Sequence, residues 1–199
     1  FCSGADLAGD GGVSPNLGET LEQFYHPLFT RLAGLEIPVV SAVNGPAVGA
    51  GVALALAGDI VLMARSAYLQ LGFVNIGLVP DAGATWLIAR SAGRARTLEM
   101  ALLGEAMSAD EAKAAGLVAR MVADDALATD AQAIARRLAC GPTVAIGLIR
   151  KQVAAALDAP LADTMAIEAG NQTRAGRTAD FREGVTAFVQ KRAPAFKGQ

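Results

Sequence analysis

The chain has 199 residues, of which 53% are hydrophobic and 18% charged, a composition that suits one good core with a smaller helical part. Its formal net charge of −2 gives no overall basic field, which argues against nucleic acid as a partner. The longest apolar run, residues 52–57, is far shorter than the ~20 residues that a membrane span needs, so we expect no membrane helix.

Two cysteines, Cys2 and Cys140, lie far apart and have no His or Cys neighbours at metal-binding spacing. We expect reduced thiols at both positions and no zinc site. The chain begins with Phe1 and shows neither the charged nor the apolar region of a secretory signal. A cytoplasmic protein is therefore the expectation.

The first part of the chain predicts a turn, a loop and a helix. Residues 1–7 are typical of a tight turn of small residues, and a Gly- and Pro-containing loop follows as far as Asn16. A helix is predicted over residues 21–35, because apolar residues recur at helical spacing and Gly34 lies at the end. We expect this helix to cover the strand that follows it.

The most informative pattern begins at residue 37. A strand is predicted over residues 37–45, where a run of β-branched residues is closed by an Asn-Gly turn. Small residues then lead into a helix predicted over residues 52–57. A glycine-rich corner of this kind exposes backbone N–H groups at the positive end of a helix dipole, an arrangement that favours an anion.

A second apolar strand is predicted over residues 60–64. After it, Asp81 stands among apolar residues shortly before the start of another helix. The sequence therefore offers a cradle of N–H groups and one isolated carboxylate as its candidate functional groups.

Strands and helices keep alternating as far as residue 122, which favours an α/β layered fold. Ser108 and Glu111 have the spacing of a capping box at the start of a short helix. The expected elements are helices over residues 86–90, 94–103 and 108–116 and a strand over residues 117–122.

From residue 124 onward the pattern is helical only. Apolar stripes predict helices over residues 127–138, 146–157, 161–170 and 181–192. Such stripes are typical of ordinary core or oligomer packing. The chain therefore divides into an α/β part, residues 1–123, and a helical part, residues 124–199.

Common nucleotide and nucleophile motifs do not fit this chain. Gly45, Gly49 and Gly51 have the wrong spacing for a dinucleotide fingerprint, and the Lys-Ser/Thr pair of a phosphate loop does not follow them. No nucleophile elbow is present, and the only histidine, His26, is typical of a surface or packing residue. What remains is the N–H cradle with Asp81. Such groups can hold an oxyanion while an acid moves a proton, as enolate chemistry requires.

Several motifs, in the same order, resemble those of the crotonase (enoyl-CoA hydratase/isomerase) superfamily. They are residues 1–7, 38–51 and 77–83, together with a C-terminal segment, residues 188–196, that is similar to the family's closing helix. The resemblance runs to the end of the chain. Family members carry a strand-and-helix segment before the first of these motifs, so we expect a fragment or an incompletely defined N-terminus.

The resemblance implies a ClpP/crotonase-like spiral of ββα units over residues 1–123 and an α-helical trimerisation region over residues 124–199. It also implies a homotrimer or a dimer of trimers that binds an acyl-CoA and stabilises a thioester enolate. No separate cofactor is implied, because coenzyme A is part of the substrate. Neither nucleic acid nor a membrane is expected as a partner.

By the same resemblance, the two oxyanion-binding N–H groups are those of Ala5 and Ala50. Because the donors are backbone groups, a small side chain is sufficient at both positions. The residues expected to contact the substrate are Cys2, Gly4, Phe73, Trp86 and Lys191. A pocket of Phe73, Trp86 and Leu71 would suit a ring-bearing or extended acyl group, although each residue is also typical of plain core.

The acids decide which reaction the resemblance implies. Family hydratases use two glutamates, whose positions are taken here by Ala53 and Phe73, so hydration is disfavoured. Asp81 matches an aspartate that transfers a proton in some isomerases of the superfamily and acts as the nucleophile in a dehalogenase branch. Its alternative role is that of a helix N-cap ahead of Ala84.

Within the superfamily the sequence most resembles the isomerase branch that acts on epoxidised phenylacetyl-CoA in phenylacetate degradation. An isomerase of CoA thioesters is therefore the function expected first. An enoyl-CoA hydratase and a non-catalytic acyl-CoA-binding protein of the same fold are the alternatives. Hydrolytic dehalogenation through Asp81 ranks last, because only His26 is available as the base for its second step.

Overall fold

The computed structural model describes residues 1–7 and 16–199; most of the loop predicted after residue 7 lies outside this range. The chain forms two compact units. The first contains Phe1–Gly34 and Val39–Ala131, and the second contains Leu35–Pro38 and Gln132–Gln199. The sequence pattern changes at residue 124, whereas the two units meet within a helix at Ala131. The short segment before the first long strand also belongs to the second unit.

The first unit contains all of the strands found in the described residues. These are β1 (Val40–Val43), β2 (Ala47–Val48), β3 (Ile60–Ala64), β4 (Tyr68–Gln70), β5 (Ala106–Ser108) and β6 (Arg120–Val122). Its helices are α1 (Leu17–Thr20), the π-helix η1 (Leu21–Tyr25), α2 (His26–Gly34), α3 (Ala50–Leu56), the 3₁₀-helix η2 (Phe73–Ile76), α4 (Ala84–Leu103) and α5 (Ala109–Ala114).

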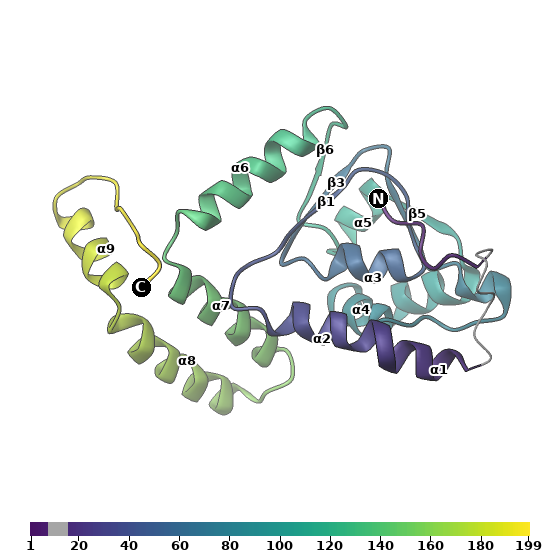
Figure 1. Ribbon diagram of the computed structural model, residues 1–199, viewed down its shortest axis with the longest axis horizontal. Coiled ribbons are helices and arrows are strands. Elements are labelled where there is room, and N and C mark those ends of the chain that lie inside the picture. Colours follow the sequence, from purple (N-terminus) through teal and green to yellow (C-terminus); the bar gives the residue numbers. More distant parts are fainter. Residues whose placement is uncertain (8–15) are drawn as a thin grey trace. The chain divides into compact units, whose positions relative to one another are not determined.

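Two three-stranded sheets make up the β-structure. One is parallel with β3 in its centre, so that Met63 pairs with Val43 of β1 on one side and with Met121 of β6 on the other. In the other, β4 is parallel to β2 and antiparallel to β5. Because parallel neighbours need a crossover, the chain returns from β1 to β3 through α3, which contacts both β1 and α4 (Figure 1). The predicted α/β layering is confirmed.

The core of this unit is built around β3. Its four residues from Val61 to Ala64 are all buried, because a central parallel strand is covered on both faces and therefore reads as a continuous apolar run. The largest fully buried side chains are Leu62, Met63, Leu69, Leu71, Ile88, Val43 and Val52. Each side chain of this size stabilises the fold by about 1.5–3 kcal/mol relative to an exposed one.

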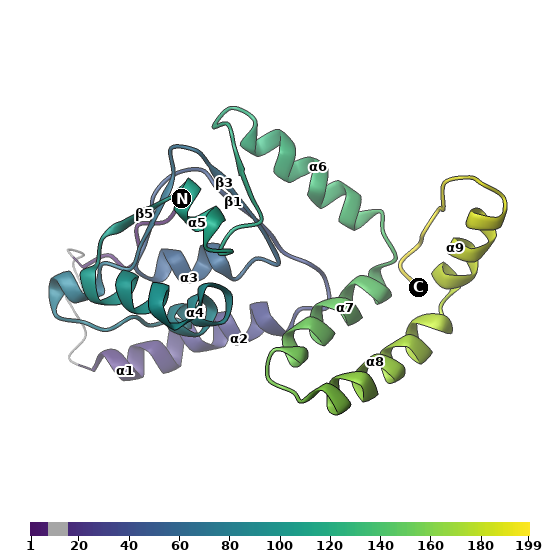
Figure 2. The same ribbon diagram turned by 180° about the vertical axis from the view of Figure 1, so that it is seen from behind.

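The helices predicted over residues 86–90 and 94–103 both lie within α4, which is kinked at Gly93, a non-helical residue with a φ of 74°. The predicted break at Gly93 is confirmed. One other helical prediction for this unit needs correction. The helix predicted over residues 21–35 extends from Leu17 to Gly34 through a π turn (Figure 2). None of its residues is buried, so the expectation that it covers the following strand is wrong.

The second unit is helical. Its elements are α6 (Leu127–Ala139), which crosses the unit boundary, α7 (Thr143–Ala156), α8 (Leu161–Gly176) and α9 (Ala179–Val189). Helices α7 and α8 pack together, and an amide hydrogen bond of 3.0 Å joins Asn171 to Gln152. The segment before β1 is held by α7, since the Lys151 ammonium lies 2.6 Å from the Glu36 carboxylate.

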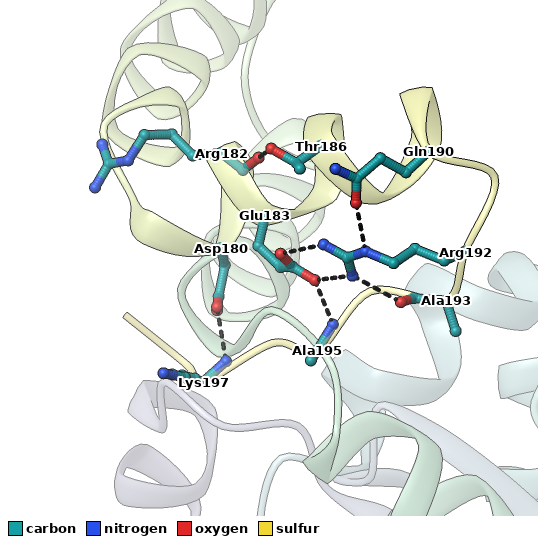
Figure 3. Close-up of polar contacts among 9 residues, drawn as sticks. All are labelled: Asp180, Arg182, Glu183, Thr186, Gln190, Arg192, Ala193, Ala195 and Lys197. Atoms are coloured by element: carbon teal, nitrogen blue, oxygen red, sulfur yellow. Dashed lines mark hydrogen bonds and ion pairs between the residues drawn. The ribbon is translucent and has the colours of Figure 1, made fainter.

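The C-terminal tail folds back onto α9 (Figure 3). The buried Asp180 carboxylate accepts the backbone N–H groups of Lys197 and Gly198 at 2.7 and 2.8 Å. Glu183 accepts two hydrogen bonds from the Arg192 guanidinium, at 2.6 and 2.9 Å. The tail is therefore an ordered part of this unit.

Among the helices of residues 1–7 and 16–199, none is long and apolar enough to cross a membrane.

Candidate active site

The N-terminal segment runs beside the corner between β2 and α3. The Cys2 N–H donates to the Pro46 carbonyl oxygen over 3.0 Å, and the Cys2 carbonyl oxygen accepts the Val48 N–H over 2.9 Å. Cys2 thereby pairs in parallel with Ala47 of β2. This pairing brings the residues after Cys2 to the start of α3.

Two glycines let the two backbones approach closely. Gly4 has a φ of 90°, and a Cβ on it would lie 2.9 Å from a carbonyl oxygen of β2 and 3.8 Å from the nitrogen of Ala50. A Cβ on Gly51 would overlap the carbonyl oxygen of Cys2. Only glycine suits such positions. Gly4, the residue before Ala5, therefore lies close to the first residue of α3.

Ala50 begins α3, and the N–H groups of a first helical turn have no partner within their own helix. The helix dipole adds a partial positive charge at the same place. The fold thus brings together the two segments that were expected to supply oxyanion donors, Ala5 and Ala50. Their role as donors stays a prediction.

A strained loop positions Asp81. Between η2 and α4, Gly77, Ala82 and Gly83 all have left-handed backbone conformations, with φ values of 76°, 52° and 83°. An alanine is uncommon in this region, and Ala82 is held there with only 3% of its surface exposed. Such strain persists where the surrounding packing enforces it, and it is concentrated at functional sites.

The loop forms one wall of a cavity of about 540 Å³. The other wall comes from the helix that begins at Leu17. The lining residues are Leu17, Gly18, Leu21, His26, Leu78, Val79, Pro80, Asp81, Ala82, Gly83, Thr85 and Trp86. Most of this surface is apolar, and among these lining residues Asp81 is the one carboxylate and His26 the one imidazole.

Asp81 is placed for proton transfer. Its Oδ1 is buried and accepts no hydrogen bond from any residue that the structure describes. Burial raises the pKa of the Asp81 carboxyl above its ordinary value of 3.8, and the charge of His26 acts in the opposite direction. A carboxyl with a perturbed pKa and a free oxygen inside a cavity is a candidate general base.

The Asp81 side chain does not cap the helix that follows. The N-cap residue of α4 is Gly83, which makes no side-chain capping bond, and the Ala84 N–H donates to the backbone oxygen of Asp81 over 2.9 Å. The capping role weighed from the sequence is therefore wrong. The left-handed turn at Ala82 and Gly83 lets the backbone of Asp81 start the helix while its carboxyl lines the cavity.

Phe73 connects the corner with the Asp81 loop. Its ring tip lies 3.7 Å from the Cβ position of Gly49, and its carbonyl oxygen accepts the Leu78 N–H over 2.9 Å. The side chain is only 8% exposed and is absent from the cavity lining given above. The structure therefore places Phe73 in the packing between the two functional elements.

The other residues predicted to contact the substrate lie in different parts of the chain, and only one of them lines the cavity. Trp86 lines the cavity, is 54% exposed, and has the guanidinium carbon of Arg90 4.3 Å from its ring centre. Cys2 and Gly4 lie in the corner beside α3. Leu71 is fully buried core. Lys191 is an exposed residue of the second unit, so its contact with substrate stays a prediction.

Sequence reasoning missed the helical wall of the cavity. Leu17 and Leu21 stand four residues apart, a helical spacing, but the sequence pattern put the start of the helix at Leu21. His26, which the sequence indicates as a surface or packing residue, is indeed exposed, but it also lines the cavity. The only signal for it was an imidazole in a helix otherwise rich in apolar residues, which by itself does not indicate a site.

The described residues contain no group of three His, Cys, Asp or Glu side chains arranged to hold a metal ion. The cavity offers one carboxyl and one imidazole, and the start of α3 offers backbone N–H groups. A carboxylate can take a proton from carbon, and N–H groups at a helix start can hold the oxyanion that results.

Known proteins match this chain along its length. Residues 1–199 match the family described as enoyl-CoA hydratase/isomerase. The chain is 48% identical to the 1,2-epoxyphenylacetyl-CoA isomerase of Escherichia coli K12, covering 100% of this chain and 78% of that protein. It is 44% identical to a probable enoyl-CoA hydratase of Rhodobacter capsulatus, covering 100% and 77%. The solved structure of an enoyl-CoA hydratase from Bacillus anthracis matches with a TM-score of 0.94 at 32% identity, covering 100% of this chain and 77% of that one.

Proposed function

Because this chain belongs to the enoyl-CoA hydratase/isomerase family, which it matches over residues 1–199, we propose that it is an isomerase that works through a thioester enolate. The predicted crotonase fold is confirmed by the likeness to solved enoyl-CoA hydratases. Family membership makes the protein a CoA-thioester isomerase or hydratase. Of these two reactions, isomerisation is the one proposed here.

The observation that carries the proposal is the single carboxyl of Asp81 in a mostly apolar cavity. Its buried Oδ1 accepts no hydrogen bond from any described residue. Adding water to a double bond needs one group to activate the water and another to protonate carbon. Moving a proton from one carbon to another needs only one group that accepts it and then returns it. The residues at the positions of the family's hydratase glutamates, Ala53 and Phe73, are buried and apolar.

The proposed reaction begins when the Asp81 carboxylate takes a proton from the carbon next to the thioester carbonyl. The electron pair of the broken C–H bond moves onto the carbonyl oxygen, giving an enolate. The N–H groups of Ala5 and Ala50 would hold that oxygen. In a substrate with a double bond next to that carbon, the electron pair then moves back through the conjugated system, and Asp81 returns its proton at the far carbon of that double bond. A ring 1,2-epoxide gains such a double bond when its epoxide C–C bond opens to give the isomeric seven-membered oxepin ring.

For the acyl group we propose a ring-bearing thioester such as 1,2-epoxyphenylacetyl-CoA. The likeness to the E. coli isomerase of that substrate supports this choice. So does the half-exposed indole of Trp86 on the cavity wall, since aromatic side chains bind flat rings well. This assignment would place the protein in phenylacetate degradation.

A panel of acyl-CoA substrates tests the proposal. We expect isomerisation of 1,2-epoxyphenylacetyl-CoA or of an unsaturated acyl-CoA, together with slow or absent hydration of crotonyl-CoA on the same preparation. A genuine enoyl-CoA hydratase serves as the positive control for hydration. Hydration at the rate of that control, without isomerisation, would establish the hydratase alternative, which the likeness to the R. capsulatus protein favours. Binding without turnover of any substrate would establish the non-catalytic alternative.

We also propose a homotrimer or a dimer of trimers as the working assembly. Large apolar side chains are exposed on the C-terminal helices of the described chain. They include Leu161, Met165, Phe181, Val185, Phe188 and Val189, each at least 49% exposed. The exposure of so many large apolar side chains on these helices supports an interface between subunits.

A further inference from the structure

We propose that His26 is a positioning residue that sets the charge of Asp81 from the helical wall of the same cavity. The inference rests on the proposed role of Asp81 as the proton carrier, and it assigns a task to a side chain that the reaction above does not use.

The first support is the composition of the cavity wall. His26 and Asp81 are its two titratable lining residues, and they come from segments more than fifty positions apart in the chain. The remaining lining is apolar or uncharged. Asp81 is partly buried and His26 is exposed, so solvent screens the interaction between their charges only in part. A change of charge on one of these two groups therefore affects the ionisation of the other.

The second support is the π turn that presents His26 to the cavity. The backbone N–H of His26 donates to the carbonyl oxygen of Leu21, five residues earlier, which is the hydrogen bond of a π-helix. In an undistorted α-helix, a residue five positions after Leu21 would lie roughly 140° further around the axis. The wider turn reduces this angle, so Leu21 and His26 both line the cavity. Phe24, which would follow Leu21 at α-helical spacing, is instead 63% exposed.

Other charged groups on the surrounding elements lie outside the lining. They are Glu19 on α1, Glu22 on η1, Arg31 on α2, and Arg90, Arg94, Arg96 and Glu99 on α4. The guanidinium of Arg90 stacks on Trp86. Burial raises the pKa of Asp81, and among charged groups it is His26 that lowers it. The imidazolium therefore opposes the effect of burial.

The consequence for catalysis concerns the acid side of the pH range. The base must be ionised to take a proton from carbon. A positive charge at His26 favours the ionised form of Asp81 and so lowers the pH at which this base takes up a proton. His26 thus extends the active range towards lower pH.

Direct titration of Asp81 tests this inference without relying on turnover. Carbon-13 NMR of the Asp81 carboxyl would be followed with pH in the wild type, in His26→Asn and in His26→Lys. We expect the titration midpoint to move to higher pH in His26→Asn, because the cation is lost, and not to rise in His26→Lys, because a cation remains. Arg31→Gln, which removes a cation from the same helix outside the cavity, should leave the midpoint unchanged.

The pH profile of kcat/KM for isomerisation gives the second readout. Its acid limb should move to higher pH in His26→Asn and be restored in His26→Lys, a pattern that a merely structural role would not produce. An Asp81 midpoint that is the same in wild type and His26→Asn overturns the inference, whatever the activity. A midpoint that shifts as expected in a protein without isomerase activity would overturn the proposed function and leave the coupling of His26 to Asp81 established.

Discussion

The fold partly buries the carboxyl of Asp81 and so removes part of its hydration. Its buried oxygen has no hydrogen-bond donor among the described residues, and burial raises its pKa. A carboxyl with a raised native pKa binds its proton more tightly when folded, which favours the fold below pH 3.8. That contribution is lost as the pH rises through the native pKa. At neutral pH the ionised Asp81 is therefore unfavourable for stability, as is common for groups kept for function.

Replacing Asp81 with Asn should separate function from stability. We expect Asp81→Asn to lose ~10² or more of isomerase turnover, because the group that accepts and returns the proton is gone. Its melting temperature at pH 7 should equal or exceed that of the wild type, and this difference should disappear below pH 3.8. Thermal melts at both pH values and single-turnover isomerisation on one preparation measure the two effects. Full activity in the variant would show that another residue carries the proton.

A second prediction at this scale concerns the oxyanion donor. Proline is tolerated at the first position of a helix, which Ala50 occupies. Ala50→Pro should keep the fold but remove the N–H, with a loss of about 10²–10³ in kcat. Ala50→Ser keeps the N–H and serves as the matched control, for which we expect near-normal turnover. Circular dichroism shows whether each variant is folded. Normal kcat in folded Ala50→Pro would exclude Ala50 as a donor.

At the scale of single elements, α9 depends on its contacts with the chain that follows it. Asp180 lies at the first turn of α9, is 3% exposed, and accepts two backbone N–H groups from the tail. The Asp180 N–H in turn donates to the carbonyl oxygen of Gln199 over 3.0 Å. The helix start and the chain end are therefore tied by three hydrogen bonds, two of which require the side chain.

Removing that side chain should loosen the tail. In Asp180→Ala the N–H groups of Lys197 and Gly198 lose their acceptor, so we expect the free energy of unfolding of this unit to fall by about 1–3 kcal/mol. Hydrogen exchange at these two amides should accelerate. Glu168→Ala, a change at an exposed acidic position on α8, is the control. Unchanged exchange in Asp180→Ala would show that the tail is held by other contacts.

The ion pair of Glu183 predicts a dependence of stability on pH. Hydrogen bonds from Arg192 and from the Ala195 N–H lower the pKa of Glu183 from 4.5 to about 2. A carboxylate with a lowered native pKa stabilises the fold above its unfolded pKa, and this contribution is lost as the pH falls. The wild type should therefore be more stable than Glu183→Gln at pH 6, and the difference should shrink between pH 4.5 and 2. Thermal melts of both proteins over this pH range measure the difference. A difference in melting temperature that stays constant with pH would contradict the lowered pKa of Glu183.

At the scale of the whole molecule, surface composition bears on assembly. Phe188 and Val189 at the end of α9 are 84% and 73% exposed, which is unusual for such side chains in a monomer. If the chain assembles as proposed, sedimentation of the wild type should show a trimer or a multiple of it. Phe188→Glu should then weaken assembly by placing a charge in an apolar interface. Gln190→Glu adds the same charge at a neighbouring exposed position and should change assembly less. A monomeric wild type would refute the proposal.

Several features of this protein were determined by the sequence alone, because their physical causes are local. The buried strand β3 was predicted with its observed bounds, since a continuous apolar run reflects burial on both faces. The capping box is confirmed, with the Ser108 Oγ accepting the Glu111 N–H at 3.3 Å and a Glu111 carboxylate oxygen accepting the Ser108 N–H at 2.8 Å. The glycine-rich corner before α3 was likewise predicted from residue type.

Other features were decided only by tertiary structure. Strands β2, β4 and β5 have two or three residues each, too few for a periodic signal, and they exist because a partner strand supplies their hydrogen bonds. Whether Asp81 caps a helix or lines a cavity depended on the left-handed backbone at Ala82 and Gly83. The place of His26 depended on a π turn and on a wall formed by a segment far along the chain. Such placements depend on packing between distant residues, which no local pattern in the sequence records.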